Sequence, residues 1–329
     1  MNHFLGSTQF VQPKELHEVM ALVAELSLRQ QPYFFFSGGT DLVPYLKNYP
    51  EQKGTLISLS RVNELRGMRM NSKQTFEIGA QTKLVELIES PLIRQHLPGL
   101  ALAAAQVASG QIRNQATLGG NLLVNNRCTY FNQSSLNRSY HDECFKSGGE
   151  VCHVIANAKR GDAPLCRARF VSDLAPVLLA LQARLTLLGP KGKRTISLDE
   201  FYLPDGIHRN QLAPGELLCG LEISTEPRRK VAYEKLRIRN AIDFPSLGVA
   251  VAWIGEGAAR QWHLALTGVH THPIHVSGPE INERFETIET LAKLASKTAQ
   301  PLKQDFLSPS YRRRMIPVLA KRALARLVE

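Results

Sequence analysis

The chain lacks any apolar run near the length of about 20 residues that crosses a bilayer, so we expect no membrane span. Its first residues lack the basic segment, apolar core and cleavage site of a signal peptide. Internal repeats and low-complexity tracts are also absent. These absences predict a soluble, cytoplasmic protein. In that reducing setting, clustered cysteines favour metal binding over disulfides.

Acidic residues are few: 29 stand against 40 basic ones, a formal net charge of +11. A basic face can bind nucleic acid by releasing counterions from phosphates. Much of this excess, however, lies in the last residues, where apolar side chains recur at helical spacing over 309–327. We therefore expect a terminal amphipathic helix that faces solvent or a partner protein, and no nucleic-acid partner.

Four of the five cysteines fall in one polar stretch, and none of them forms the C-x-x-C pair of zinc ribbons or bacterial ferredoxins. They are Cys128, Cys144, Cys152 and Cys166, at intervals of 16, 8 and 14 residues. Four thiolates can bind a zinc ion or a 4Fe-4S cluster, and the spacing leaves disulfides or scattered buried thiols open as well. The fifth, Cys219, lies in an apolar strand pattern that predicts a core position.

At 329 residues the chain is too long for one ordinary core, and its length predicts two or three domains. Strands and helices alternate in the first third, which predicts open α/β layers. From about 125 to 169 no periodic apolar stripe can be traced, so we expect an inserted loop. A boundary near 223–229 precedes a last domain of strands and two helices.

Two glycine pairs stand between an apolar segment and the start of a helix: Gly38-Gly39 in the loop 37–42, and Gly119-Gly120 in the loop 117–121. Glycine lets backbone N–H groups approach a diphosphate without a Cβ in the way. Thr40 can donate a hydroxyl to a phosphate, and it or Asp41 can cap the following helix. Two such loops can hold one dinucleotide, although ordinary tight turns explain them equally well.

Four ordered motifs, SGGTDL, ATLGGN, SDLAPVLLAL and YEKLRIRNAIDFPSLGVAVA, resemble those of the FAD-binding medium subunits of molybdenum hydroxylases, over nearly the whole chain. The resemblance implies an α+β fold. Residues 1–222 would form a PCMH-type FAD-binding domain of two α/β subdomains, with the insertion at about 125–169. Residues 223–329 would form a small domain of antiparallel sheet and helices.

The insertion itself resembles a subgroup of that family. Asn121 and Asp173 are 52 residues apart, far more than in most members, and RCTYFNQS and CHVI resemble the medium (β) subunit of 4-hydroxybenzoyl-CoA reductase. That resemblance implies a 4Fe-4S cluster on Cys128, Cys144, Cys152 and Cys166. The sequence departs from the pattern by an added KRGDAP before the last cysteine, a length that a surface loop absorbs at little cost.

The resemblance also implies which residues hold FAD. Asp173 would bond its ribityl or ribose hydroxyls, and Lys235 would lie near the isoalloxazine and favour its anionic reduced form. By spacing alone, Asp173 reads as a helix N-cap and Lys235 as a solvated strand lysine. The remaining implied contacts are Phe35, Phe36, Ser37, Gly38, Gly39, Thr40, Asp41 and Leu42 of the first loop and Thr117, Leu118, Gly119, Gly120 and Asn121 of the second.

Histidines gather near the end of the chain, at His263, His270, His272 and His275. Neighbours on a strand and its following loop rarely converge, and the sequence nearby offers no carboxylate or cysteine to complete a shell. We therefore expect these four to be structural, and we do not expect His153 to replace a thiolate ligand.

By resemblance the chain is an electron-transfer subunit of a 4-hydroxybenzoyl-CoA reductase that forms benzoyl-CoA in aromatic degradation. No catalytic residue is assigned, because molybdopterin and 2Fe-2S centres would lie on large and small partners in a dimer of heterotrimers. Electrons would pass from a ferredoxin-like donor through 4Fe-4S, FAD and 2Fe-2S to molybdenum. One alternative complex oxidises an aldehyde or N-heterocycle. Another alternative is a basic, zinc-dependent nucleic-acid-binding protein.

Overall fold

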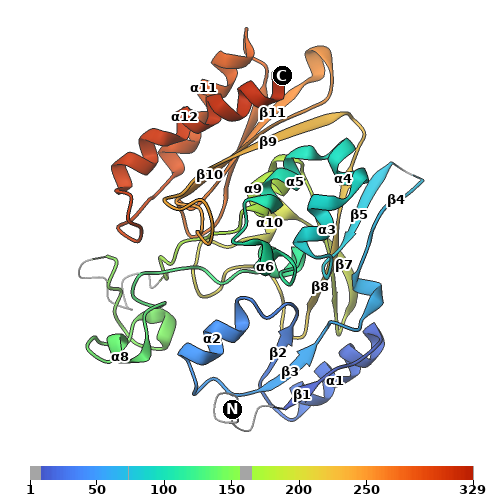
Figure 1. The fold of residues 1–329 in the computed structure, drawn as a ribbon, viewed down its shortest axis with the longest axis vertical. Coiled ribbons are helices and arrows are strands. Elements are labelled where there is room, and N and C mark those ends of the chain that lie inside the picture. The colour runs from blue at the N-terminus through green and yellow to red at the C-terminus, as the bar shows by residue number, and fades with distance from the viewer. Residues whose placement is uncertain (1–8, 73, 156–164, 329) are drawn as a thin grey trace.

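Three sheets follow one another along the long axis of the molecule (Figure 1). The computed structural model describes residues 9–72, 74–155 and 165–328. The three-stranded N-terminal sheet lies at the bottom of the view, the five-stranded sheet in the middle and the four-stranded C-terminal sheet at the top. Helices pack on each of them, so the expected α+β class is confirmed.

The N-terminal sheet is parallel, in the order β1 (Phe10–Val11), β3 (Thr55–Ser58), β2 (Tyr33–Phe36). Parallel neighbours need crossover connections, and α1 (Leu16–Leu28) and α2 (Leu42–Asn48) lie in these connections. The buried face of α1 carries Val19, Val23 and Leu26, at the spacing of one helix face, and packs with Ile57 and Leu59.

The middle sheet is antiparallel, in the order β4 (Met68–Met70), β5 (Thr75–Gly79), β8 (Leu217–Ser224), β6 (Arg184–Gly189), β7 (Gly192–Ser197). Of the two expected α/β layers, the N-terminal sheet is parallel and the middle sheet is not. The reason is long-range: β8 comes from far along the chain and pairs between β5 and β6.

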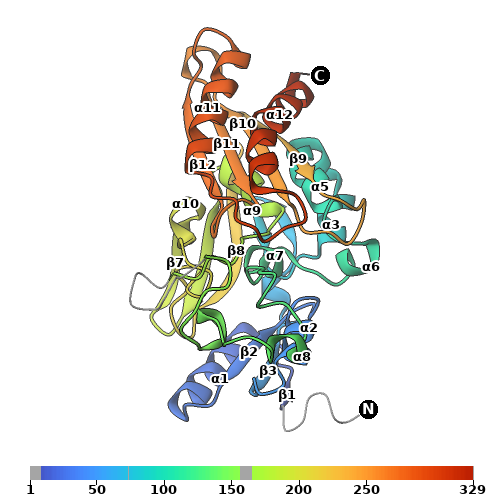
Figure 2. The same ribbon diagram turned by 90° about the vertical axis from the view of Figure 1, so that its left-hand side faces the viewer.

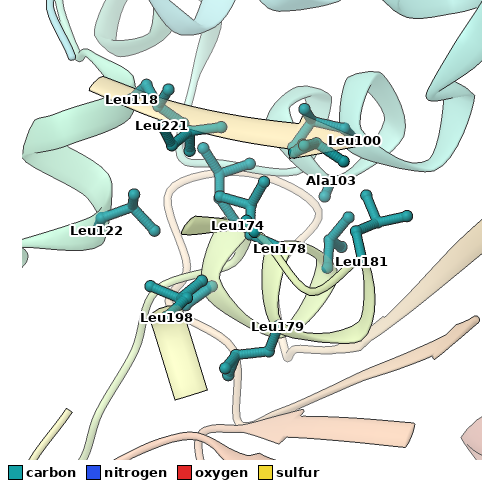
Figure 3. Packing of buried hydrophobic residues seen from close by; sticks show 14 of the residues in the cluster. Leu100, Ala103, Leu118, Leu122, Leu174, Leu178, Leu179, Leu181, Leu198 and Leu221 are labelled. Carbon is teal, nitrogen blue, oxygen red and sulfur yellow. The ribbon is translucent and has the colours of Figure 1, made fainter. Parts of the chain in front are cut away.

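Short helices fill the space between this sheet and the C-terminal one. They are α3 (Leu84–Glu89), α4 (Pro91–His96), α5 (Pro98–Ala105), α6 (Gly110–Arg113), α7 (Leu118–Leu122), α9 (Leu174–Ala180) and α10 (Leu198–Phe201). All seven residues of α9 are buried. Figure 3 shows Leu174, Leu178 and Leu181 directed toward Leu100, Ala103 and Leu221 in the main core.

The C-terminal sheet is an antiparallel meander of β9 (Arg229–Leu236), β10 (Leu247–Ile254), β11 (Gln261–Thr267) and β12 (Ile274–Pro279). Both faces are covered. Val249 and Val251 pack under α11 (Arg284–Thr298) and α12 (Pro309–Val328), whereas Ala250 and Ala252 join the core around α9. The predicted terminal helix thus packs one face on the sheet. The division of domains at residue 223 stays a prediction.

The cysteine-containing stretch runs along the side of the molecule with little regular structure, as predicted. It contains α8 (Ser135–Arg138) and a short turn of 3-10 helix at Phe145–Ser147. Both views place α8 beside α2 (Figures 1 and 2). Arg138 donates to the Asn48 carbonyl oxygen, and the Tyr49 hydroxyl donates to the Phe131 carbonyl oxygen. The added KRGDAP lies at 159–164, outside the described residues.

Candidate functional site

The two glycine loops, 80 residues apart in sequence, are in direct contact. Ser37 Oγ and Thr117 Oγ1 are hydrogen bonded at 2.9 Å. A Cβ at Gly38 would lie 2.0 Å from the Gln115 carbonyl oxygen, so only glycine allows this approach of the loops. The structure therefore brings together the two segments that the sequence assigns to one dinucleotide.

The first loop offers its backbone N–H groups. Within the described residues, the N–H groups of residues 38–41 donate to no protein acceptor. Gly39 has a φ of +69°, which favours glycine, and a Cβ there would lie 2.7 Å from the Phe36 ring. Consecutive free donors in a turn form a concave site for an anion. This loop fits a diphosphate by the chemistry of its donors.

The second loop differs from the expectation. The N–H groups of Leu118 and Gly119 donate to the carbonyl oxygens of Thr82 and Ala80, and that of Gly120 donates to the Thr117 hydroxyl. Three N–H groups expected to face phosphate are thus already paired within the protein. Gly120 is exposed, and a Cβ there would meet only Thr117 Oγ1, at 3.1 Å. The second loop therefore supplies open space for a ligand rather than donors.

Asp41 occupies the N-cap position of α2, but its side chain does not cap the helix. Its carboxylate instead forms an ion pair with Arg127 and accepts from the Asn125 N–H at 3.3 Å. The first glycine loop is thereby fastened to the segment that carries the cysteines. The capping expected of Asp41 was wrong because a cation distant in sequence competes for the carboxylate.

The other residues predicted from the first loop lie around it. The rings of Phe35 and Phe36 are half-buried and pack edge-on against neighbouring aromatic rings. Thr40 is exposed, and Leu42 is the first residue of α2. Their contacts with FAD stay a prediction.

Asn121 connects the second loop to the SDLAP motif. Its side-chain oxygen accepts from Ser172 Oγ at 2.7 Å and from the Leu174 N–H at 3.3 Å. These bonds place Asp173 directly beside the second loop. The sequence analysis did not identify Ser172, because a serine gives no signal of a partner 51 residues away.

Asp173 and Lys235 form a buried ion pair with a separation of 2.9 Å, and their side chains are 4% and 0% exposed. Tyr233 donates its hydroxyl to the other Asp173 oxygen at 2.7 Å. Lys235 Nζ also donates to the carbonyl oxygens of Gln106 and Asp243, both at 2.9 Å. Three acceptors at one nitrogen require the ammonium form, since a neutral amine has only two N–H bonds.

Asp173 does occupy the N-cap position of α9, as its spacing indicates, but its side chain makes no cap bond there. The reading of Lys235 as a solvated strand lysine was wrong, because its side chain is buried. Burial raises the pKa of Asp173 and lowers that of Lys235, and the attraction between the two charges opposes both changes. The pair has no net charge, and its ammonium is held by three protein acceptors. Contact of either side chain with FAD stays a prediction.

The four cysteines of the insertion line one cavity, with an otherwise largely apolar wall that includes Phe131, Phe145 and Val154. All five cysteines are free thiols in this structure. Burial raises the pKa of Cys128, and it raises that of Cys166 to about 11. Cys219 lies apart on β8 and packs against the N-terminal core.

Whether the thiols gather around one point bears on the kind of metal that they could bind. In the part of the chain that the structure describes, no three His, Cys, Asp or Glu side chains are grouped closely enough to hold one metal ion. Each thiolate of a cubane binds a different iron, so its cysteines stand farther apart than the ligands of a tetrahedral zinc. The four thiols thus line one cavity without any three ligands being grouped around a single ion, and the kind of metal that they bind stays a prediction.

The C-terminal histidines form two separate pairs. His263 and His275 are hydrogen bonded at 3.1 Å, and His275 Nδ1 lies 2.8 Å from Asp199 Oδ1, a carboxylate that the sequence analysis did not anticipate. His270 and His272 both contact Thr271 Oγ1. Burial lowers the pKa of His263 and of His270 to about 4. The expectation that these side chains do not converge was wrong, and their structural role stays a prediction.

Three comparisons place the chain among known proteins. Residues 6–225 match the family model of the FAD binding domain in molybdopterin dehydrogenase. The chain is 30% identical to the aldehyde oxidoreductase FAD-binding subunit PaoB of Escherichia coli, covering 81% of this chain and 85% of that one. It is 27% identical to the carbon monoxide dehydrogenase medium chain of Hydrogenophaga pseudoflava, covering 95% and 94%.

A solved structure of carbon monoxide dehydrogenase from Hydrogenophaga pseudoflava superposes with a TM-score of 0.71 at 25% identity, over 97% of this chain and 96% of the other. The fold is thus shared from end to end. No helix in the described ranges is long and apolar enough to cross a membrane.

Proposed function

Because this chain belongs to the family of FAD binding domains in molybdopterin dehydrogenases, we propose that its two glycine loops hold FAD for electron transfer in a molybdenum-enzyme complex. The free N–H groups of residues 38–41 would bind the diphosphate. The exposed face of Gly120 would let the nucleotide approach the second loop. Bound FAD would supply exchange of either one or two electrons.

The ammonium of Lys235, the positive end of a pair without net charge, would act on the flavin. Both side chains are engaged with protein atoms, so the ammonium of Lys235 is held in place rather than free to move. A cation beside the isoalloxazine favours its anionic reduced form. Asn121, bonded to Ser172, would keep this pair in register with the second loop.

We further propose that Cys128, Cys144, Cys152 and Cys166 bind a 4Fe-4S cluster. The observation that carries this proposal is that all four cysteines line one cavity. The cavity is small, about 20 Å³, so the segment must open around a cubane. The ion pair between Asp41 and Arg127 connects the proposed flavin loop to the residue before Cys128, which suits electron transfer between the two groups.

For the substrate, we propose reductive dehydroxylation of 4-hydroxybenzoyl-CoA to benzoyl-CoA, with electrons from a ferredoxin-like donor, since the cysteine segment resembles that subgroup. Oxidation of an aldehyde or N-heterocycle is the second candidate, and it is supported by relatives such as the aldehyde oxidoreductase subunit. In either case the partners would be a large molybdopterin subunit and a small 2Fe-2S subunit, in a cytoplasmic dimer of heterotrimers. The zinc-dependent nucleic-acid alternative loses its basis with the family assignment.

Replacing one proposed ligand tests the cluster against the flavin site. In a chain purified without oxygen, Cys144→Ser should abolish the iron signal and leave FAD bound. Cys219→Ser is the matched control, because Cys219 lies outside the cavity, and it should keep both iron and flavin. Loss of FAD with iron retained in Cys144→Ser would contradict the assignment.

A further inference from the structure

Lys146 is a partly buried lysine beside the four-cysteine cavity, and the sequence analysis did not identify it. It lines the cavity together with the four thiols. Its Nζ donates to Asn125 Oδ1 at 2.7 Å, to the Asn126 carbonyl oxygen at 3.2 Å and to the Gly206 carbonyl oxygen at 2.7 Å. Three acceptors at one nitrogen require the charged ammonium form.

The partners of this charge are all neutral. The three acceptors are amide oxygens, and the ammonium also lies 5.0 Å from the centre of the Phe131 ring. Arg209 is similarly buried nearby, and it donates to the carbonyl oxygens of Leu123 and Val124. Buried charges are ordinarily paired with an opposite charge. Two cations with neutral partners therefore call for negative charge close by.

The four cysteines line the same cavity as this ammonium, and the Asp205 carboxylate accepts from the Cys166 N–H at 2.9 Å. A 4Fe-4S cluster with four thiolates carries net negative charge, which increases on reduction. A fixed ammonium at its wall therefore stabilises the reduced form more than the oxidised form.

We infer that Lys146 is the counter-charge of the cysteine-bound cluster and sets its reduction potential. This inference rests on the proposed cluster but not on the identity of the substrate. Lys146 would act through its charge on the cluster and would take no part in the reaction of a substrate. Its role is distinct from ligation, which belongs to the four cysteines.

Redox titration of the full chain, followed by electron paramagnetic resonance, tests this role. In Lys146→Met the equilibrium constant for one-electron reduction of the cluster should fall about tenfold, which is a midpoint about 59 mV more negative. Lys146→Gln keeps a donor without the charge and should show the same shift if the Met variant folds poorly. Lys146→Arg keeps the charge and should restore most of the wild-type potential.

Arg138→Met is the matched control. Arg138 belongs to the same segment and also donates to two carbonyl oxygens, but it does not line the cysteine cavity. Its removal should change the equilibrium constant less than about twofold, because solvent screens a partly exposed charge. An unchanged cluster potential in both Lys146→Met and Lys146→Gln would overturn the inference about Lys146 but leave the cluster proposal standing. A wild-type chain without iron would overturn the cluster proposal and the inference with it.

Discussion

The Gly120→Ala substitution tests whether the second glycine loop binds FAD, because it should weaken FAD binding without affecting folding. The added methyl group would meet only Thr117 Oγ1, at 3.1 Å, and a hydroxyl can shift by the small amount required. Gly120 also has no positive φ, and Ala is favoured over Gly in a helix by about 1 kcal/mol. The flavin-free Gly120→Ala chain should therefore be as stable as the wild type.

The same methyl group would project into the space that the nucleotide needs. Displacing the diphosphate enough to lose one charge-assisted hydrogen bond costs about 2 kcal/mol, or about 30-fold in Kd. Titration of FAD into the flavin-free chain, followed by flavin fluorescence, measures this. Gly110→Ala is the control, since a Cβ there meets nothing within 4 Å, and its affinity should not change. Wild-type affinity in Gly120→Ala would refute the placement of FAD against this loop.

Two further predictions concern buried charge. Lys235→Met leaves the Asp173 carboxylate buried without its cation, so we expect the free energy of unfolding to fall by about 3–5 kcal/mol. The double variant Asp173→Asn/Lys235→Met should recover part of that loss. A loss under about 1 kcal/mol in urea denaturation would contradict the pairing. Burial lowers the folded-state pKa of His263 to about 4, so the unfolded chain binds the extra proton between its ordinary pKa and that value. The free energy of unfolding should therefore fall as the pH drops from the ordinary histidine pKa to the folded-state value, by on the order of 2 kcal/mol for His263. Urea denaturation at neutral and at acidic pH measures this loss, and His263→Gln should reduce it.

The sequence predicted those features that depend on local pattern. The terminal helix expected over 309–327 spans Pro309–Val328, and the polar insertion has little regular structure, because apolar spacing determines both. The order of the four motifs identified the family. The two glycine pairs left open whether their loops meet at one dinucleotide or are ordinary turns, and the contact of Ser37 with Thr117 was not predicted.

Contacts between distant segments could not be predicted from pattern. The insertion of β8 between β5 and β6 makes the middle sheet antiparallel, and no local signal specifies that pairing. The Asp41 carboxylate has several possible partners in sequence, and only the fold selects Arg127. Likewise, the donors of the second glycine loop are taken by carbonyl groups of a segment some 40 residues earlier, at Ala80 and Thr82. A loop motif defines a backbone shape but not which of its N–H groups remain free.

The most direct test is the cofactor content of the full chain, isolated without oxygen together with whatever subunits accompany it. Extraction and quantification should give about one FAD and about four irons per chain, in a yellow-brown protein. A colourless chain that contains neither flavin nor iron, and that does not take up FAD when it is added, would contradict the account.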